Sequence, residues 1–74
     1  MAVKYQKFRD LRKRNLYTCE SLGKELGVTG ALVSYWETGA SKPQLEILPD
    51  IARVLNTNVN TLLKIFYGLD LSEN

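Results

Sequence analysis

The sequence contains no histidine, and this absence removes a large group of chemical functions. Without histidine there is no imidazole general base, no histidine-based catalytic triad and no histidine metal ligand. The single cysteine, Cys19, can form neither a disulfide within the chain nor a cysteine-rich zinc site. We therefore expect a protein that is not an enzyme, binds no metal or other cofactor, and works in a reducing compartment, the cytoplasm.

Long apolar runs are also missing. The longest unbroken run of apolar residues has three members, whereas a membrane-spanning helix needs about 20. The N-terminal residues are charged from Lys4 onward and lack the apolar stretch of a signal peptide. The 74-residue chain contains 45% hydrophobic and 24% charged residues. This composition is typical of a globular protein, and the length fits one domain. We therefore expect residues 1–74 to form a single domain without membrane contact.

The positive charge is concentrated at one end. Residues 1–14 contain six basic residues and one acidic residue, which gives this segment a net charge of +5, although the whole chain carries only +2. A basic end on a small protein is compatible with a nucleic-acid partner or an acidic protein partner. It is equally compatible with an ordinary solvated helix face, so charge alone does not decide between them.

The spacing of apolar residues predicts an all-α fold, because no segment shows the strict alternation typical of strands. Five helices are expected at about residues 3–14, 18–26, 30–38, 45–55 and 59–67, with Leu16 packed under the end of the first. Thr18, Thr29 and Asn58 are the expected N-caps. Pro49 either kinks the fourth helix or stands near the start of its regular part.

Residues 18–38 form a helix-turn-helix signature. Gly27 permits a sharp turn between two short helices, and Val28 is placed to fill the angle between them. Gly23 lies where the second helix of the pair must approach the first, which requires a small residue. Apolar residues on both helices, Leu22 and Leu26 on one and Val33 on the other, supply a shared core.

Motifs typical of one known family of helix-turn-helix domains extend on both sides of this signature, over residues 8–63. These motifs comprise residues 11–12, 18–29, 33–39, 42–43, 55 and 58–62. The most specific is the Ser-x-x-Glu-x-Gly stretch at Ser34, Glu37 and Gly39, followed by Lys42 and Pro43. In these motifs the chain resembles the phage repressor and Cro type of helix-turn-helix domain, also called the xenobiotic-response-element family.

This resemblance implies a compact five-helix, lambda-repressor-like domain whose third helix, residues 30–38, enters the DNA major groove. The motif core would span residues 18–38, and residues 59–74 would form the C-terminal helix and tail. Position by position, the residues implied to face bases are Gly30, Ala31, Ser34 and Tyr35. The residues implied to contact the sugar–phosphate backbone or thymine methyl groups are Arg12, Thr18, Cys19, Thr29, Leu32, Thr38, Ser41, Lys42 and Gln44.

The first recognition positions depart from the family pattern. Family members usually carry polar side chains there, which pair with base edges, whereas Gly30, Ala31 and Leu32 offer no side-chain donor. Only Ser34 and Tyr35 remain for hydrogen bonding. We therefore expect methyl contacts or DNA shape to carry more of the specificity, unless this surface binds a protein in place of DNA.

Two other positions also depart from the pattern. Pro49 puts the usual geometry of the fourth helix in doubt, and Gly23 replaces the more usual alanine at a cost of about 1 kcal/mol in helix propensity. Cys19 is interpreted as a small residue near a helix start, where its thiol pKa would be lowered.

Several residues have a purely structural interpretation beside the functional one. Phe8 and Trp36 fall on inward-facing stripes and are expected in the core rather than as stacking platforms for bases. Tyr35 is either a base contact or a rim residue. Arg12 and Glu37 are either an ion pair that positions Arg12 for a phosphate or two solvated charges of little consequence.

The C-terminal segment suggests self-association. Residues 62–71 contain seven apolar side chains in ten positions, more than one helix stripe needs, and exposed together the surplus would exceed a normal surface patch. We expect a homodimer that buries them, or a tail that folds back over its own core. The residues assigned to the dimer interface are Ile65, Tyr67, Leu69 and Leu71.

Two functions follow from these observations. The first is a sequence-specific DNA-binding transcriptional regulator, a small repressor or Cro-like protein that binds a palindromic double-stranded operator as a homodimer. The second is a protein-binding helix-turn-helix module, an antirepressor or antitoxin-like partner of another regulator. The apolar Gly30–Ala31–Leu32 surface and the modest net charge favour the second.

Overall fold

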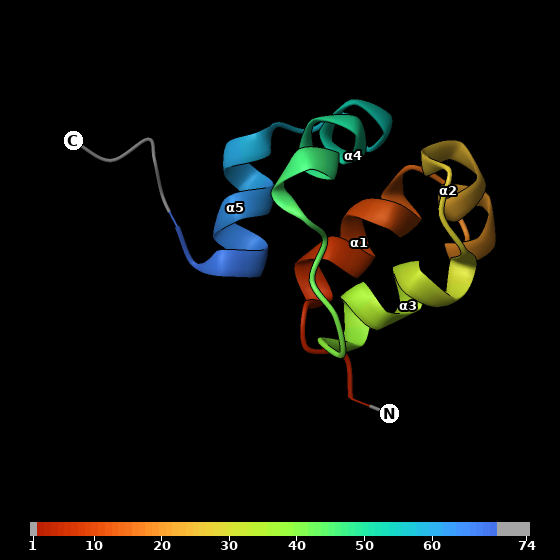
Figure 1. The fold of residues 1–74 in the computed structure, drawn as a ribbon, viewed down its shortest axis with the longest axis horizontal. Helices are drawn as coiled ribbons and strands as arrows, with labels where there is room; N and C mark the ends of the chain where they lie inside the picture. The colour runs from red at the N-terminus through yellow and green to blue at the C-terminus, as the bar shows by residue number, and fades with distance from the viewer. Residues whose placement is uncertain (1, 70–74) are drawn as a thin grey trace.

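The computed structural model describes residues 2–69, and Figure 1 shows how its helices pack together. These residues form the elements α1 (Gln6–Arg14), α2 (Cys19–Leu26), α3 (Gly30–Thr38), the 3-10 helix η1 (Leu45–Ile47), α4 (Leu48–Val54) and α5 (Val59–Tyr67). The all-α, five-helix prediction is confirmed, and no strand occurs among residues 2–69. None of the described helices has the length and apolar character needed to cross a membrane.

All five α-helices contribute to one hydrophobic core. At its centre the Phe8 ring lies 6.2 Å from the Trp36 ring and 5.1 Å from the Phe66 ring, measured between centroids. Tilted and edge-to-face contacts of this kind are the favourable arrangements for aromatic pairs. Phe8 and Trp36 are buried, so their interpretation as core residues is confirmed.

The helix ends follow the caps predicted from the sequence. The side chains of Thr18, Thr29 and Asn58 each accept a hydrogen bond from a backbone amide in the first turn of α2, α3 and α5. Three glycines in the left-handed conformation close the same helices at residues 27, 39 and 68. These local signals fix where the helices begin and end because they satisfy backbone groups that have no partner inside the helix.

The start of α1 differs from the prediction. The helix begins at Gln6 rather than near residue 3, because the preceding segment pairs with another helix. The Tyr5 backbone N–H donates to the Glu37 carbonyl oxygen at 3.0 Å, and Lys4 packs its stem against Gly39 at the end of α3. These contacts hold residues 4 and 5 in a non-helical path across α3.

The turn after α1 also corrects an expectation. Leu16 does not pack under the helix: its side chain is 92% exposed, and its φ of +65° is left-handed. The Leu16 and Tyr17 amides donate to the Lys13 and Arg12 carbonyl oxygens, and this closure turns the Leu16 side chain outward. Asn15 tethers the same turn by donating to the Leu55 carbonyl oxygen at 2.9 Å.

The predicted fourth helix is divided into two parts. Residues 45–47 form η1, and the α-helical part is Leu48–Val54 with Pro49 in its first turn. Proline is tolerated there because a first-turn amide has no intrahelical partner. Of the two alternatives for Pro49, the structure therefore supports a position near the helix start.

Candidate nucleic-acid interface

Helices α2 and α3 form the predicted helix-turn-helix unit, and their close approach depends on Gly23. A Cβ atom built on Gly23 would lie 2.7 Å from the Val28 carbonyl oxygen and 2.9 Å from the Thr29 carbonyl carbon. Glycine therefore leaves room for the backbone of the turn to lie directly against α2. Gly27, with a φ of +78°, makes the turn itself.

The inner face of α3 packs into the hydrophobic core. Val33, Trp36 and Glu37 are buried, whereas Ala31 and Tyr35 are exposed on the outer side. The Tyr35 side chain is 52% exposed. Because the inner residues anchor the helix, its outer face is presented to solvent as a rigid surface.

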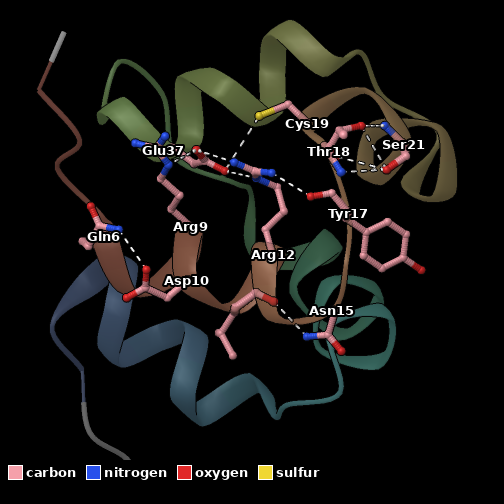
Figure 2. A network of polar contacts seen from close by, with 11 residues as sticks. Gln6, Arg9, Asp10, Arg12, Asn15, Tyr17, Thr18, Cys19, Ser21 and Glu37 are labelled. Atoms are coloured by element: carbon pink, nitrogen blue, oxygen red, sulfur yellow. Dashed lines mark hydrogen bonds and ion pairs between the residues drawn. The ribbon is translucent and has the colours of Figure 1, made fainter.

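A buried ion pair behind α3 is the strongest polar contact to this helix. Figure 2 shows Arg12 of α1 extending toward Glu37 of α3. The guanidinium Nε and Nη2 donate to the two carboxylate oxygens of Glu37, and Nη1 donates to the Tyr17 carbonyl oxygen at 2.7 Å. Arg9 forms a second, longer ion pair with the same carboxylate, with its Nε 3.9 Å from Glu37 Oε1. The ion-pair interpretation is confirmed, and the solvated-charge alternative is wrong.

This pair fixes the direction of the Arg12 side chain. The side chain is 9% exposed, and its donor nitrogens are directed at Glu37 and Tyr17. The hydrogen bond to Glu37 raises the pKa of Arg12 although burial acts in the opposite direction. Arg12 therefore positions α3 against α1, and its expected contact with the DNA backbone stays a prediction.

Cys19 lies beside the same ion pair, and its environment also differs from expectation. Its thiol donates to Glu37 at 3.8 Å, which turns the side chain inward. Burial and the negative charge of Glu37 raise the pKa of Cys19, whereas a position near a helix start was expected to lower it. The thiol therefore faces Glu37, and the expected contact of Cys19 with the DNA backbone stays a prediction.

The four residues expected to face bases do not all point the same way. Ala31, Ser34 and Tyr35 share the outer face of α3 by their spacing of three and four residues. Gly30 differs, because a Cβ atom there would lie 2.9 to 3.1 Å from atoms of Glu20. A side chain at position 30 would thus point at α2, so only the backbone of Gly30 belongs to the outer surface.

The residues expected along the DNA backbone lie at the edges of the same surface. The Thr18 and Thr29 hydroxyls cap α2 and α3, and the Thr38 hydroxyl donates to the Tyr35 carbonyl oxygen at 3.3 Å. Leu32 and Ser41 are half-buried, whereas Lys42 and Gln44 are exposed. Their contacts with the DNA backbone, like that of Arg12, stay predictions.

An interaction between Lys42 and Tyr67 was missed by sequence reasoning. The Lys42 ammonium lies 5.0 Å from the centre of the Tyr67 ring, and the Tyr67 hydroxyl donates to the Pro43 carbonyl oxygen at 2.7 Å. The loop after α3 is thereby tied to the end of α5. No local sequence signal reveals this contact, because its partners are 24 residues apart.

The same contact changes the expectation for the C-terminal segment. Tyr67 is expected at a dimer interface because the sequence shows no contact for it within the chain. In the structure its ring contacts Lys42 and its hydroxyl donates to the Pro43 carbonyl oxygen. Ile65 is half-buried against the core, and Leu69 is 49% exposed. Leu71 lies outside the described residues. Among the described residues assigned to the dimer interface, Leu69 is therefore the one most accessible to a second copy of the chain.

The described residues contain no group of three or more histidine, cysteine or carboxylate side chains able to hold a metal ion. Polar contacts in the helix-turn-helix unit fix helices in place, as the Thr18–Ser21 cap at the start of α2 illustrates in Figure 2. What the surface offers a ligand is a rigid helix face with few donors, bordered by hydroxyl groups and one exposed lysine, Lys42.

Comparisons with known proteins agree with this geometry. A helix-turn-helix family model matches residues 8–62. Among solved structures, the chain is similar to the P22 c2 repressor protein, crystallised in complex with synthetic operator 9T in the presence of Tl+, with 28% sequence identity and a TM-score of 0.76. That match covers 86% of this chain and 97% of the repressor chain. No curated protein sequence matches the chain. Because the family model extends from α1 into α5, the chain belongs to the helix-turn-helix family.

Proposed function

We propose that this protein is a sequence-specific DNA-binding transcriptional regulator that inserts α3 into the major groove of its operator. The observation that carries the proposal is the exposed outer face of α3, held rigid by Trp36 and the Arg12–Glu37 pair on its inner side. The similar P22 c2 repressor protein is described in complex with an operator. In such a unit the first helix, here α2, crosses the DNA backbone while the second, the recognition helix α3, contacts bases.

In this complex Ala31, Ser34 and Tyr35 contact base edges, and the Gly30 backbone approaches the DNA closely. Only Ser34 and Tyr35 bring hydrogen-bonding side chains, so bidentate contacts to bases are few. Apolar contacts to thymine methyl groups and sequence-dependent DNA shape supply the remaining specificity.

Backbone contacts position the protein without selecting a sequence. We assign this role to side chains at the edge of the α3 surface and to amides at the start of α2, where a helix N-terminus favours phosphate. Lys42 is the side chain of this group that brings a full positive charge. The assigned residues are Thr18, Cys19 through its backbone, Thr29, Leu32, Thr38, Ser41, Lys42 and Gln44.

The operator is proposed to be palindromic and bound by a homodimer. One module of this size makes too few contacts for tight specific binding, and a two-fold dimer would place two recognition helices about 34 Å apart, one DNA turn. Leu69, half-exposed beyond α5, and the partly buried Ile65 are the described residues that would contribute to the contact. We further propose that the protein acts in the cytoplasm, without catalytic activity or a cofactor.

A second candidate function is a protein-binding module that retains the helix-turn-helix fold. The specific observation in its favour is the apolar start of α3, where Ala31 is exposed and Leu32 half-buried. An antirepressor or antitoxin-like partner of another regulator would use this apolar surface against protein.

Salt dependence separates the two functions. We expect the protein to bind random duplex DNA in a gel shift or anisotropy titration with an affinity that falls steeply between about 50 and 200 mM salt. The slope of log K against log salt counts the phosphates contacted. A folded protein that binds no duplex at low salt would contradict the DNA-binding proposal and favour the protein-binding alternative.

A further inference from the structure

The basic N-terminal segment is divided between two opposite sides of α1. Because successive helix residues are rotated by about 100°, Arg9 and Arg12 project from one side, whereas Lys7 and Arg14 project from the other. Arg9 and Arg12 face Glu37 and α3. The charges of Lys7 and Arg14 therefore lie away from α3 and outside the proposed DNA-binding face.

The other side of α1 borders a groove between α1 and α5 with a volume of about 1130 Å³. Lys4, Lys7 and Arg14 line it, and none of the three forms an ion pair with any carboxylate of residues 2–69. Asp10 also lines the groove and accepts a hydrogen bond from the neutral amide of Gln6 at 2.8 Å. Lys4, Lys7 and Arg14 outnumber this carboxylate, so together these four residues carry a net positive charge.

Apolar side chains line the same groove. Leu11 of α1 and Val59 of α5 line it, and both are only partly buried against the core. A surface that combines positive charge with apolar atoms matches a ligand with negative charges and apolar side chains. A phosphate backbone supplies only the first of these features.

We infer that this groove is a second binding surface that docks an acidic peptide segment of another protein, with apolar side chains against Leu11 and Val59 and carboxylates near Lys7 and Arg14. The inference does not depend on DNA binding. The groove lies on the side of α1 opposite to Arg12, and Arg12 contacts the inner face of α3. A peptide in the groove and a DNA duplex on the outer face of α3 can therefore be bound together.

The test uses the full chain labelled with ¹⁵N and a synthetic acidic peptide of about twelve residues, with glutamates interrupted by leucines at helical spacing. We expect amide shifts confined to α1 and the first half of α5. The double variant Lys7→Glu/Arg14→Glu should weaken peptide binding by about tenfold at low salt, because both charges are reversed. A second peptide, with serines in place of the leucines, should bind more weakly than the first.

The matched control for the single variant Lys7→Glu is Lys13→Glu, which reverses an equal exposed charge on the same helix outside the groove. When both are measured near physiological salt, we expect Lys13→Glu to change peptide affinity by less than about twofold and by less than Lys7→Glu, since distant charges are screened there. Circular dichroism verifies that each variant is folded. Affinity for duplex DNA should be unchanged by saturating peptide, which keeps this inference separate from the DNA-binding proposal.

Several outcomes would overturn the inference. Peptide-induced shifts centred on α3, or an equal loss of affinity in Lys13→Glu, would show that the peptide binds by general charge. Competition between duplex DNA and peptide for the groove amides would make the groove a nucleic-acid surface. Ile65 also borders the groove, so a loss of self-association in Lys7→Glu/Arg14→Glu, seen by sedimentation, would assign the groove to a second copy of the chain.

Discussion

The two faces of α3 are built under different constraints. On the inner face Val33, Trp36 and Glu37 are almost completely buried, and each contacts groups from other helices. On the outer face Ala31 and Tyr35 contact mainly solvent. The fold therefore determines one face of α3 and leaves the other face free to determine which ligand is bound.

Substitutions on the two faces should therefore affect different quantities. A change on the inner face alters the free energy of unfolding, since it leaves a cavity or an unpaired charge in a close-packed core. A change on the outer face alters affinity for the ligand and leaves stability nearly unchanged.

The largest effect is expected from Glu37→Ala. This substitution leaves the Arg12 guanidinium buried without its carboxylate, so the free energy of unfolding should fall by about 3–5 kcal/mol, measured by urea denaturation. The matched control is Asp50→Ala, which breaks the exposed Asp50–Arg53 pair and should cost under about 1 kcal/mol. Similar losses in the two variants would contradict the role of the buried pair.

Tyr35→Ala should weaken binding to the preferred DNA site by about 1–3 kcal/mol and relax one base position. The unfolding midpoint should stay nearly constant, because half of the side chain is exposed. Tyr35→Phe separates the hydroxyl from the ring: an intermediate loss indicates that both contribute. If affinity and base preference are unchanged in Tyr35→Ala, the residue is a rim residue.

Leu16→Gly is expected to stabilise the protein by up to about 1 kcal/mol. Relief of the left-handed conformation gains about 1–2 kcal/mol, part of which is lost to the greater freedom of glycine in the unfolded chain. The exposed Leu16 side chain gives up little packing. Asn56, with a φ of +55°, is the control, since asparagine tolerates this conformation and Asn56→Gly should shift stability less. A destabilised Leu16→Gly would show that the exposed leucine has an unrecognised packing role.

Lys42→Ala should weaken all duplex sequences alike and reduce the salt slope by about one unit, because it removes one phosphate contact. Lys13→Ala, an equal loss of charge away from this surface, provides the comparison and should leave the slope unchanged. Loss of specificity without a change of slope would contradict a backbone role for Lys42.

The smallest effect concerns Cys19 and pH. Its raised pKa means that the folded thiol stays protonated where an unfolded one ionises, so the stability it contributes is complete below the ordinary thiol pKa and declines as pH rises toward the raised value. We expect alkylation of Cys19 at pH 8 to be slower than that of a free cysteine, and Cys19→Ser to lack this decline. Alkylation as fast as in the unfolded chain would contradict the buried thiol environment.

Features set by neighbouring residues could be predicted from the sequence. Caps such as Thr18 and Gly27 satisfy backbone groups within one helical turn, so local spacing identifies them. The inner positions of α3 follow from helical periodicity in the same way. This explains why the capped ends of α2, α3 and α5, the helix-turn-helix unit and the aromatic core agree with expectation.

Features set by distant residues could not be predicted. The late start of α1 depends on a hydrogen bond from Tyr5 to Glu37, and the internal use of Tyr67 depends on Pro43. The inward direction of Cys19 and the burial of Arg12 likewise follow from the position of Glu37. For this reason the helix that carries the candidate contact surface could be predicted from local spacing, whereas the directions of individual side chains around it required the structure.

Selection of bound sites from a pool of random duplex DNA tests whether the outer face of α3 recognises a DNA sequence. We expect the wild-type protein to enrich a palindromic site with half-sites one helical turn apart. Tyr35→Ala should enrich the same palindrome with one base position relaxed in each half. A folded wild-type protein that enriches no sequence above the starting pool would contradict the claim that the outer face of α3 recognises DNA.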